Sequence, residues 1–358
     1  MAQDNDISQQ LADAVKSAAQ KRAPLAIAGS GSKRFHTGEI AGEKLHVTGH
    51  RGIVSYEPTE LVITARAGTP LAEIEAALAG KGQMLGFEPP HFGATATIGG
   101  TLACGFSGPR RPYAGAARDF VLGTTIVNGQ GEILHFGGQV MKNVAGYDVS
   151  RLMVGALGTL GVLLEMSLKV LPKPAQEITL AFEMPAGKAI STLNDWAGQP
   201  LPLSAAAHAG DTLYVRLSGT EVGVRAACAR LHGTTVDNGG DFWRALREQQ
   251  HDFFQDEIPL WRLSVPPAAP PLTLPGEWLI DWGGAQRWLK TDVPAEQVHR
   301  VASRVGGHAS LFRETRHRPD ALPPLPTALM ALHLHLRQAF DPAGILNREL
   351  LYPMEGVA

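Results

Sequence analysis

The sequence has little cysteine, no excess of charge of either sign and no long apolar run. Cys104 and Cys228 are its only cysteines and no CxxC spacing occurs, so a disulfide framework and a cysteine-ligated zinc or iron–sulfur site are excluded. A reducing cytoplasm is expected. Lys and Arg total 32 against 34 for Asp and Glu, so no electrostatic excess is present to hold a polyphosphate backbone, and nucleic acid is not expected as a partner.

We expect neither a membrane helix nor an export signal. The polar N-terminus does not have the charged-then-apolar order of a signal peptide, so no cleavage is expected. The longest weakly polar stretch, residues 152–166, contains Glu165 and several glycines. It is shorter than the roughly 20 residues that a bilayer span needs. We expect the chain to reach a membrane only through partner proteins.

Length and composition predict two domains. A chain of 358 residues, 44% of them hydrophobic, can bury a large core in more than one unit. Period-two alternation over residues 162–170 predicts a strand that Pro172 and Pro174 end, so we place the boundary near Pro174, with domains 1–174 and 175–358. The order of strands and helices in the second domain suggests an antiparallel sheet with helices on one side, built as two ferredoxin-like halves.

Within the first domain, several residues carry local structural predictions. Thr69 and Pro70 are interpreted as the N-cap and first residue of a helix that ends at Gly80. Asp148 is interpreted as a helix cap rather than a catalytic base. Residues 93–131 are crowded with Gly, Ala and Thr and too poor in large side chains for an ordinary core, so we expect the backbone there to approach a ligand closely.

A loop of glycine and serine, residues 29–32, follows the short apolar strand 25–28 at once. Glycines permit a tight turn whose amide hydrogens can face a pyrophosphate. A nicotinamide-type fingerprint would need a third glycine where Arg34 stands, and the spacing excludes a Walker A loop. Taken alone, the loop is equally compatible with a serine-rich turn that holds no ligand.

A second glycine cluster makes a ligand site the better interpretation. Residues 94–103, ATATIGGTLA, combine two adjacent glycines with hydroxyls and small side chains. These properties allow phosphates and a flat ring to be seated without side-chain collisions. We therefore interpret Gly99 and Gly100 as ligand contacts rather than simple turn residues, and expect the glycine-lined turns to leave their amides bare.

Three blocks of sequence, in this order, carry a resemblance to a known family. They are IAGSGSKRFHTG at 27–38, ATATIGGTLACGFSGPRRPYAGAARD at 94–119 and KNVAGYDVSRLMVGALGTLGVLLEMSLKV at 142–170. From about Arg22 to Pro174 the chain resembles the FAD-binding domain of the vanillyl-alcohol oxidase and p-cresol methylhydroxylase type, and within that family the FAD-binding subunits of bacterial glycolate oxidase (glycolate dehydrogenase). A shorter piece, AFDPAGILN at 339–347, is similar to the closing segment of 2-hydroxy-acid dehydrogenases.

The resemblance implies an α+β fold and a set of cofactor contacts. The fold would be an FAD-binding domain of two α+β subdomains, followed by a ferredoxin-like antiparallel sheet cap domain whose C-terminal segment returns to the flavin. The implied first pyrophosphate loop is Ala28, Gly29, Ser30, Gly31, Ser32 and Lys33. The implied second loop, beside the flavin and its phosphates, contributes Thr95, Thr97, Ile98, Gly99 and Gly100. Backbone groups of Gly161 and Val162 would face the cofactor, and Asn347 would return near the ring.

The resemblance also implies how the cofactor is held. No histidine lies in the flavin loops apart from His36, which is beyond the first loop, so we expect non-covalent FAD and no metal. Tyr147 and Cys104 are expected to be packing residues near the site.

Two departures from related catalytic subunits leave the catalytic residues unknown. Those subunits read SEGTLG where this chain has ALGTLG at 156–161, and they carry a late histidine-rich metal and substrate motif that nothing here matches. His333 and His335, two residues apart on a helix, would point to different sides. No base for a hydroxyl proton is evident. Cations that could orient the carboxylate of a 2-hydroxy acid are Arg110, Arg111, Arg313 and Arg316.

The resemblance finally implies an oxidoreductase that works inside a complex. Its partners would be a second flavin subunit and an iron–sulfur subunit, and the complex would oxidise glycolate, a small 2-hydroxy acid, to glyoxylate. The subunit would be cytoplasmic, peripheral to the inner face of the cell membrane, and its flavin would either oxidise the substrate or relay electrons. Two alternatives stay open: a stand-alone FAD-dependent 2-hydroxy-acid dehydrogenase, and a non-catalytic flavin-fold scaffold subunit.

Overall fold

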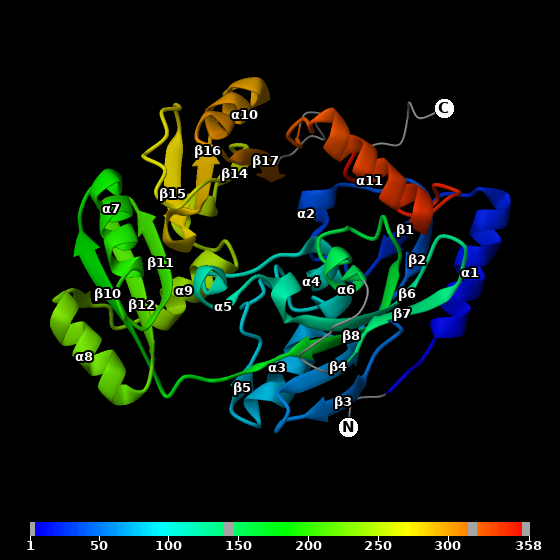
Figure 1. Ribbon diagram of the computed structural model, residues 1–358, viewed down its shortest axis with the longest axis horizontal. Helices are drawn as coiled ribbons and strands as arrows, with labels where there is room; N and C mark the ends of the chain where they lie inside the picture. The colour runs from blue at the N-terminus through cyan, green and yellow to red at the C-terminus, as the bar shows by residue number, and fades with distance from the viewer. Residues whose placement is uncertain (1–3, 139–146, 314–320, 353–358) are drawn as a thin grey trace. The chain divides into compact units, whose positions relative to one another are not determined.

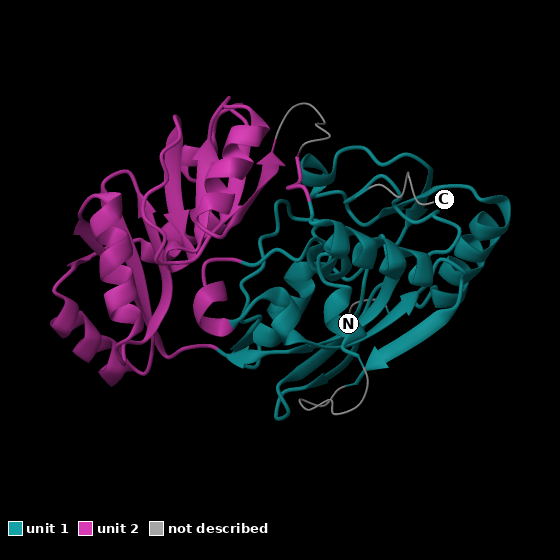
Figure 2. Ribbon diagram, turned by 45° about the horizontal axis from the view of Figure 1, so that its top comes forward, with its two compact units in different colours: residues 1–107, 115–172, 325–358 teal, residues 108–114, 173–324 magenta. Residues whose placement is uncertain are grey.

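The computed structural model describes residues 4–138, 147–313 and 321–352 (Figure 1). The chain divides into two compact units (Figure 2). The first unit comprises residues 1–107, 115–172 and 325–358, and the second comprises residues 108–114 and 173–324. Among the described residues, no helix combines the length and the apolar character that a membrane crossing requires.

The larger sheet of the first unit is antiparallel and has the strand order β3-β4-β8-β6-β7. Its strands are β3 (Ile53–Glu57), β4 (Val62–Arg66), β6 (Val121–Val127), β7 (Ile133–Gly137) and β8 (Val162–Lys169). Beside it are α3 (Leu71–Ala79), α4 (Ile98–Cys104), η1 (Ala117–Phe120), α6 (Val149–Leu152) and the short pair β5 (Gln83–Met84) and β9 (Leu171–Pro172). The apolar residues of β8 are buried on both faces, so this strand is central to the core.

A second α+β part of the first unit is built around a parallel pair of strands. It contains α1 (Ser8–Lys21), β1 (Leu25–Ala28), α2 (Arg34–Thr37), β2 (Glu43–His46) and, late in the chain, α11 (Thr327–Phe340). Leu11 and Val15 of α1 pack with Leu25 and with Val127 of β6 in one hydrophobic core. The segment after α11 returns to this core, where Leu346 forms a parallel bridge with Leu25. The two predicted α+β subdomains are confirmed.

The second unit is an eight-stranded antiparallel sheet of order β13-β10-β12-β11-β15-β16-β14-β17. Its strands are β10 (Gln176–Glu183), β11 (Leu203–Ala209), β12 (Thr212–Gly219), β13 (Thr234–Thr235), β14 (Leu260–Ser264), β15 (Glu277–Asp281), β16 (Gln286–Lys290) and β17 (His308–Arg313). Its helices are α5 (Arg111–Ala114), α7 (Ala186–Ala197), α8 (Glu221–Leu231), α9 (Gly239–Arg247), η2 (Asp252–Phe254), η3 (Trp282–Gly284) and α10 (Ala295–Arg304).

This sheet consists of two ferredoxin-like halves joined edge to edge. The first half runs β10-α7-β11-β12-α8-β13, and its strands lie in the spatial order fourth, first, third, second. In the second half the strand order is β15-β16-β14-β17, that is second, third, first, fourth, which is the reverse of the order in the first half. The proline-rich connection 265–276, which is not helical, stands where the first helix of a ferredoxin-like half would be. The halves meet where β11 pairs with β15. The predicted ferredoxin-like antiparallel sheet is therefore confirmed.

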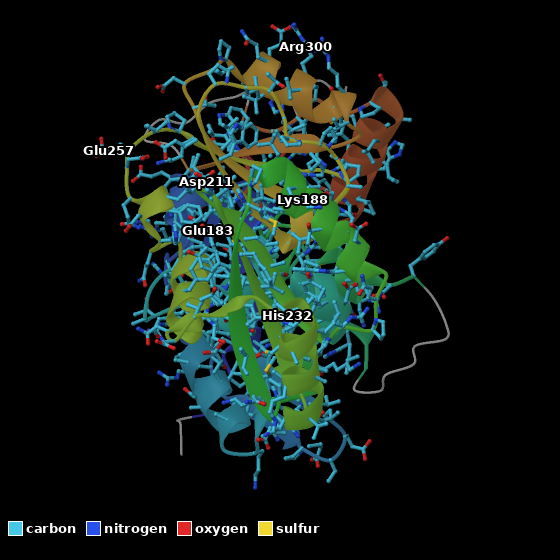
Figure 3. All side chains as sticks on the ribbon, turned by 90° about the vertical axis from the view of Figure 1, so that its left-hand side faces the viewer. Glu183, Lys188, Asp211, His232, Glu257 and Arg300 are labelled. Atoms are coloured by element: carbon cyan, nitrogen blue, oxygen red, sulfur yellow. The ribbon has the colours of Figure 1, made fainter. Side chains whose placement is uncertain are left out.

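Each half of the second unit has its own core. Leu193 of α7 and Val224 of α8 pack on Val215 of β12, whereas Val298 of α10 packs on Trp261 of β14. Figure 3 looks onto this unit: Glu183 and Asp211 lie at the same end of paired β10 and β12, Lys188 lies on α7 and His232 lies at the end of α8.

Three local predictions in the first unit can be compared with the structure. The helix after Thr69 begins at Leu71 with Pro70 as its N-cap, one residue later than predicted, because the Thr69 hydroxyl instead bonds the backbone N–H and C=O of Gly52. Asp148 is confirmed as a helix cap, since its carboxylate accepts from Arg151 N at 3.1 Å. The prediction that Tyr147 packs near the site is wrong, because its side chain is 98% exposed.

Candidate cofactor site

A cavity of about 260 Å³ lies within the first unit, where β1, α4, the turn before β8 and the C-terminal segment converge. The predicted cofactor residues on its wall are Ala28, Gly29, Ser30, Gly31, Ser32, Lys33, Thr97, Gly99, Gly100, Gly161 and Asn347. Thr95, Ile98 and Val162 are not part of that wall. Thr95 is exposed, whereas Ile98 and Val162 are fully buried in the core.

The loop after β1 presents open backbone donors to the cavity. Within the described part of the chain, the N–H groups of Gly29, Ser30, Gly31 and Ser32 donate to no protein acceptor. Gly31 has a φ of +80°, which L side chains rarely adopt, so glycine makes this turn possible. A Cβ on Gly29 would lie 3.0 Å from the Thr97 hydroxyl, so glycine also lets this loop approach α4 closely. Four consecutive unpaired donors at a cavity form a site suited to an anion.

Positive charge lies along the same wall. The Lys33 side chain is 6% exposed, and its Nζ donates to His91 O at 3.2 Å and to the Ser32 hydroxyl at 3.3 Å. Arg34 and Lys44 also line the cavity. The buried lysine beside the open amides adds a full charge to their partial charges, which favours a phosphate group over a neutral ligand.

The second glycine cluster is organised differently from the prediction. Gly99 N donates to Ala67 O at 2.9 Å and Gly100 N donates to the Thr97 hydroxyl at 3.3 Å, so the amides at the start of α4 are not bare. A Cβ on Gly99 would lie 2.7 Å from Ala67 Cβ. The expectation of bare amides thus fails for this loop, because α4 caps itself and packs on the residue that follows β4. Both glycines nevertheless lie on the cavity wall.

The turn before β8 forms another part of the wall. Leu157 has a φ of +52° and Gly158 a φ of +75°, so two successive residues adopt the left-handed conformation. The N–H groups of Gly158 and Gly161 donate to no acceptor in the described ranges. A Cβ on Gly161 would lie 2.9 Å from Ile126 Cδ1 and 3.1 Å from Val127 O, so this glycine packs closely on β6 as well.

The cavity wall offers binding groups but little acid–base chemistry. Among the described residues on it, Glu39 is the one carboxylate and there is no histidine. Cys104, expected as a packing residue near the site, is on the wall, and burial raises the pKa of its thiol to about 11 against an opposing effect of Lys33. The thiol is therefore protonated at neutral pH. No group of three metal-ligating side chains occurs among the residues described.

The histidines considered from the sequence lie away from this wall. His36 contacts Phe106 edge-on, with ring centroids 5.0 Å apart, and is not a lining residue. His333 on α11 contacts Tyr352 edge-on at 5.6 Å, and His335 is exposed. None of these three histidines lines the cavity, so none supplies a base there.

The three described arginines among those considered as carboxylate ligands belong to the second unit. Arg110 forms an ion pair with Glu177, and the guanidinium of Arg111 lies 4.3 Å from the centre of the Trp282 ring. Arg313 donates to a glutamine side chain at 2.5 Å. Arg316 lies outside the described residues, as do residues 142–146 of the third sequence block.

Several wall residues were missed by the sequence reasoning. Arg34 and Lys44 carried a signal, because both are basic residues close to the first loop in sequence. Ala67 and Leu350 carried none, because their place on the wall depends on the fold rather than on a motif.

Comparison with known proteins supports the cofactor indicated by this geometry. Residues 7–137 match the family described as FAD binding domain. The chain is 51% identical over 352 residues to the glycolate oxidase subunit GlcE of Escherichia coli (strain K12), covering 98% of this chain and 99% of that protein. It is 36% identical over 130 residues to the glycolate oxidase subunit GlcD of Bacillus subtilis (strain 168), covering 36% of this chain and 27% of that protein.

A solved structure shows the same fold. Alkyldihydroxyacetonephosphate synthase superposes with a TM-score of 0.68 at 13% identity, covering 95% of this chain and 74% of that one. This likeness concerns the fold alone. The predicted family is confirmed by the full-length match and by the FAD-binding domain: the chain belongs to the family of the glycolate oxidase subunit GlcE.

Proposed function

We propose that this chain is the FAD-binding subunit of a multi-subunit glycolate oxidase (glycolate dehydrogenase). The observation that carries the proposal is the run of N–H groups at Gly29 to Ser32, which have no acceptor among the described residues and line a cavity in a chain of the GlcE family. The cofactor diphosphate would accept from these amides, and Lys33 would balance part of its charge. Thr97, Gly99, Gly100 and Gly161 would line the remaining length of the cofactor.

FAD bound here supplies an acceptor for the two electrons that glycolate loses when it becomes glyoxylate. The wall residues of this chain would hold the cofactor. The Cys104 thiol beside it would stay protonated at neutral pH, and therefore unreactive, because burial raises its pKa to about 11. Among the described residues of the wall, none is a histidine that could take the hydroxyl proton, and Glu39 is the one carboxylate. This shortage favours a subunit that depends on a complex over a self-sufficient enzyme. We further propose non-covalent FAD, because His36 is turned to Phe106 rather than to the cavity.

The proposed partners are a second flavin subunit and an iron–sulfur subunit. Support comes from the full-length likeness to a protein named as a glycolate oxidase subunit, and from the partial likeness to another subunit of that name, GlcD. The chain would be cytoplasmic, and its contact with the inner face of the membrane would pass through these partners. The domain functions, FAD binding in 1–174 and a cap in 175–358, belong to the same proposal.

The proposal is tested by separating the chain from its partners. The purified chain, loaded with FAD, is expected not to reduce a dye with glycolate, whereas the complete complex is expected to do so. Dye reduction by the chain alone would support the alternative of a stand-alone 2-hydroxy-acid dehydrogenase. Full activity of a complex assembled with a chain that cannot bind FAD would support the non-catalytic scaffold instead.

A further inference from the structure

The C-terminal segment contributes one buried side chain to the cofactor site, that of Asn347. It is 3% exposed, lies on the cavity wall and has a φ of +39°. Its Oδ1 accepts from Ile27 N at 2.8 Å, and its Nδ2 donates to Leu157 O at 2.7 Å. One carboxamide thus joins two wall segments that are far apart in sequence.

The side-chain oxygen of Asn347 accepts a hydrogen bond from the edge of β1 that is not paired with β2, where a neighbouring strand would otherwise supply a backbone carbonyl. Leu25 N donates to Ile345 O at 2.8 Å, and two residues later Ile27 N donates to the Asn347 side chain. The next amide on that edge, two residues further, belongs to Gly29, and it is the first of the open donors. Within the described ranges, the bond from Ile27 N to Asn347 is therefore the last hydrogen bond along this edge of β1, and the next amide on the edge, that of Gly29, belongs to the cofactor loop.

At its nitrogen end, Asn347 holds a strained turn. Leu157 is a non-glycine residue with a φ of +52°, a conformation that costs about 1 kcal/mol or more and persists only when the surroundings fix it. Two hydrogen bonds fix it here: Leu157 N donates to Ala103 O at 2.9 Å, and Leu157 O accepts from Asn347. A Cβ on the next residue, Gly158, would lie 2.8 Å from the Asn347 amide nitrogen.

We propose that Asn347 is a positioning residue for FAD, which sets the spacing between the diphosphate loop after β1 and the turn at 157–161. Each end of its carboxamide makes a hydrogen bond to the protein backbone, and through these two bonds it places the open amides of Gly29 and Gly158. The inference rests on the proposed binding of FAD in this cavity.

The test uses two substitutions at this position and one matched control. Asn347→Asp keeps the shape and the acceptor but loses the donor to Leu157 O. Asn347→Gly loses both bonds while tolerating the φ of +39° without strain, so it preserves the backbone. The control is Asn128→Asp, since Asn128 is 4% exposed in the same unit, bonds at both ends of its carboxamide and is not on the cavity wall.

Isothermal titration of FAD into each apoprotein should show a dissociation constant raised about tenfold or more for both Asn347 variants, because a buried polar group loses its partner. Asn128→Asp should stay within about threefold of wild type, even where urea unfolding shows a comparable loss of stability. Wild-type affinity in the Asn347 variants, or an equal loss in the control, would overturn the inference. A wild-type chain that binds no FAD would instead overturn the proposed function.

A second measurement addresses the strained turn. Leu157→Gly removes the steric cost of the left-handed conformation, so the turn should depend less on Asn347. Adding it to Asn347→Gly should recover at least a threefold gain in FAD affinity, which a purely structural role for Asn347 would not predict. No recovery in the double variant would overturn the assignment of the amide to Leu157.

Discussion

Replacing Gly99 by alanine should destabilise the first unit even when no cofactor is bound. The new Cβ would lie 2.7 Å from Ala67 Cβ and 2.8 Å from Ala67 O. Backbone atoms cannot rotate away, so α4 would have to shift and weaken the bond from Gly99 N to Ala67 O. Overpacking costs about 1–3 kcal/mol and a net hydrogen bond about 1 kcal/mol, so we expect a loss of about 2–4 kcal/mol in unfolding free energy.

The matched control is Gly80→Ala, at the end of α3 in the same unit. Gly80 has a φ of −62° and its Cβ would meet nothing closer than 3.5 Å, so the change should stay within about 0.5 kcal/mol. All tryptophans lie between residues 196 and 288, in the second unit, so urea unfolding of the apoprotein should be followed by far-UV circular dichroism. A Gly99→Ala apoprotein as stable as wild type would refute the packing explanation.

Three further predictions concern charged and titrating groups. Lys33→Met should weaken FAD binding about tenfold or more, because a charge-assisted contact contributes roughly 1.5–3 kcal/mol, and it should make the binding less dependent on salt. Calorimetric titrations of wild type and variant at two salt concentrations measure both effects, and an affinity that is the same in the two proteins at each salt concentration would contradict the prediction. In a Cys228→Ser background, alkylation of Cys104 by iodoacetamide should be slow at pH 7.5 and accelerate toward pH 11, since burial raises the pKa of this thiol to about 11; fast labelling at pH 7.5 would contradict it. Burial lowers the pKa of His50 below 6.5, so unfolding takes up a proton in acid and stability should fall as the pH drops below 6.5; His50→Gln should flatten this part of the urea-measured profile, and an unchanged slope would argue against it.

Periodicity and turn residues predicted much of the second unit. Helix α8 (Glu221–Leu231) begins after the capping residue Thr220, and α10 (Ala295–Arg304) begins after Pro294, so both helix starts carry a local sequence signal. Helix α9 (Gly239–Arg247) was not predicted. Its segment is amphipathic, but it begins with two glycines, which have a low helix propensity. Capping residues and periodicity therefore indicate helices that begin at a Ser, Thr or Pro signal, but not a helix that begins with glycine.

The cofactor site shows what sequence alone leaves undetermined. The glycines of the first loop were predicted to leave amides open, and those amides have no partner among described residues. The same glycine signal at Gly99 reflects packing against Ala67, a neighbour that only the fold brings close. The two bonds of Asn347 join residues 320 and 190 positions away, so no local pattern could reveal them.

The measurement that tests the central claim most directly is a titration of FAD into the purified apoprotein, followed by absorbance and calorimetry. We predict uptake of one FAD per chain, with a flavin spectrum shifted from that of the free cofactor and release of the flavin on acid precipitation. A folded chain that takes up no FAD at any concentration would contradict the account.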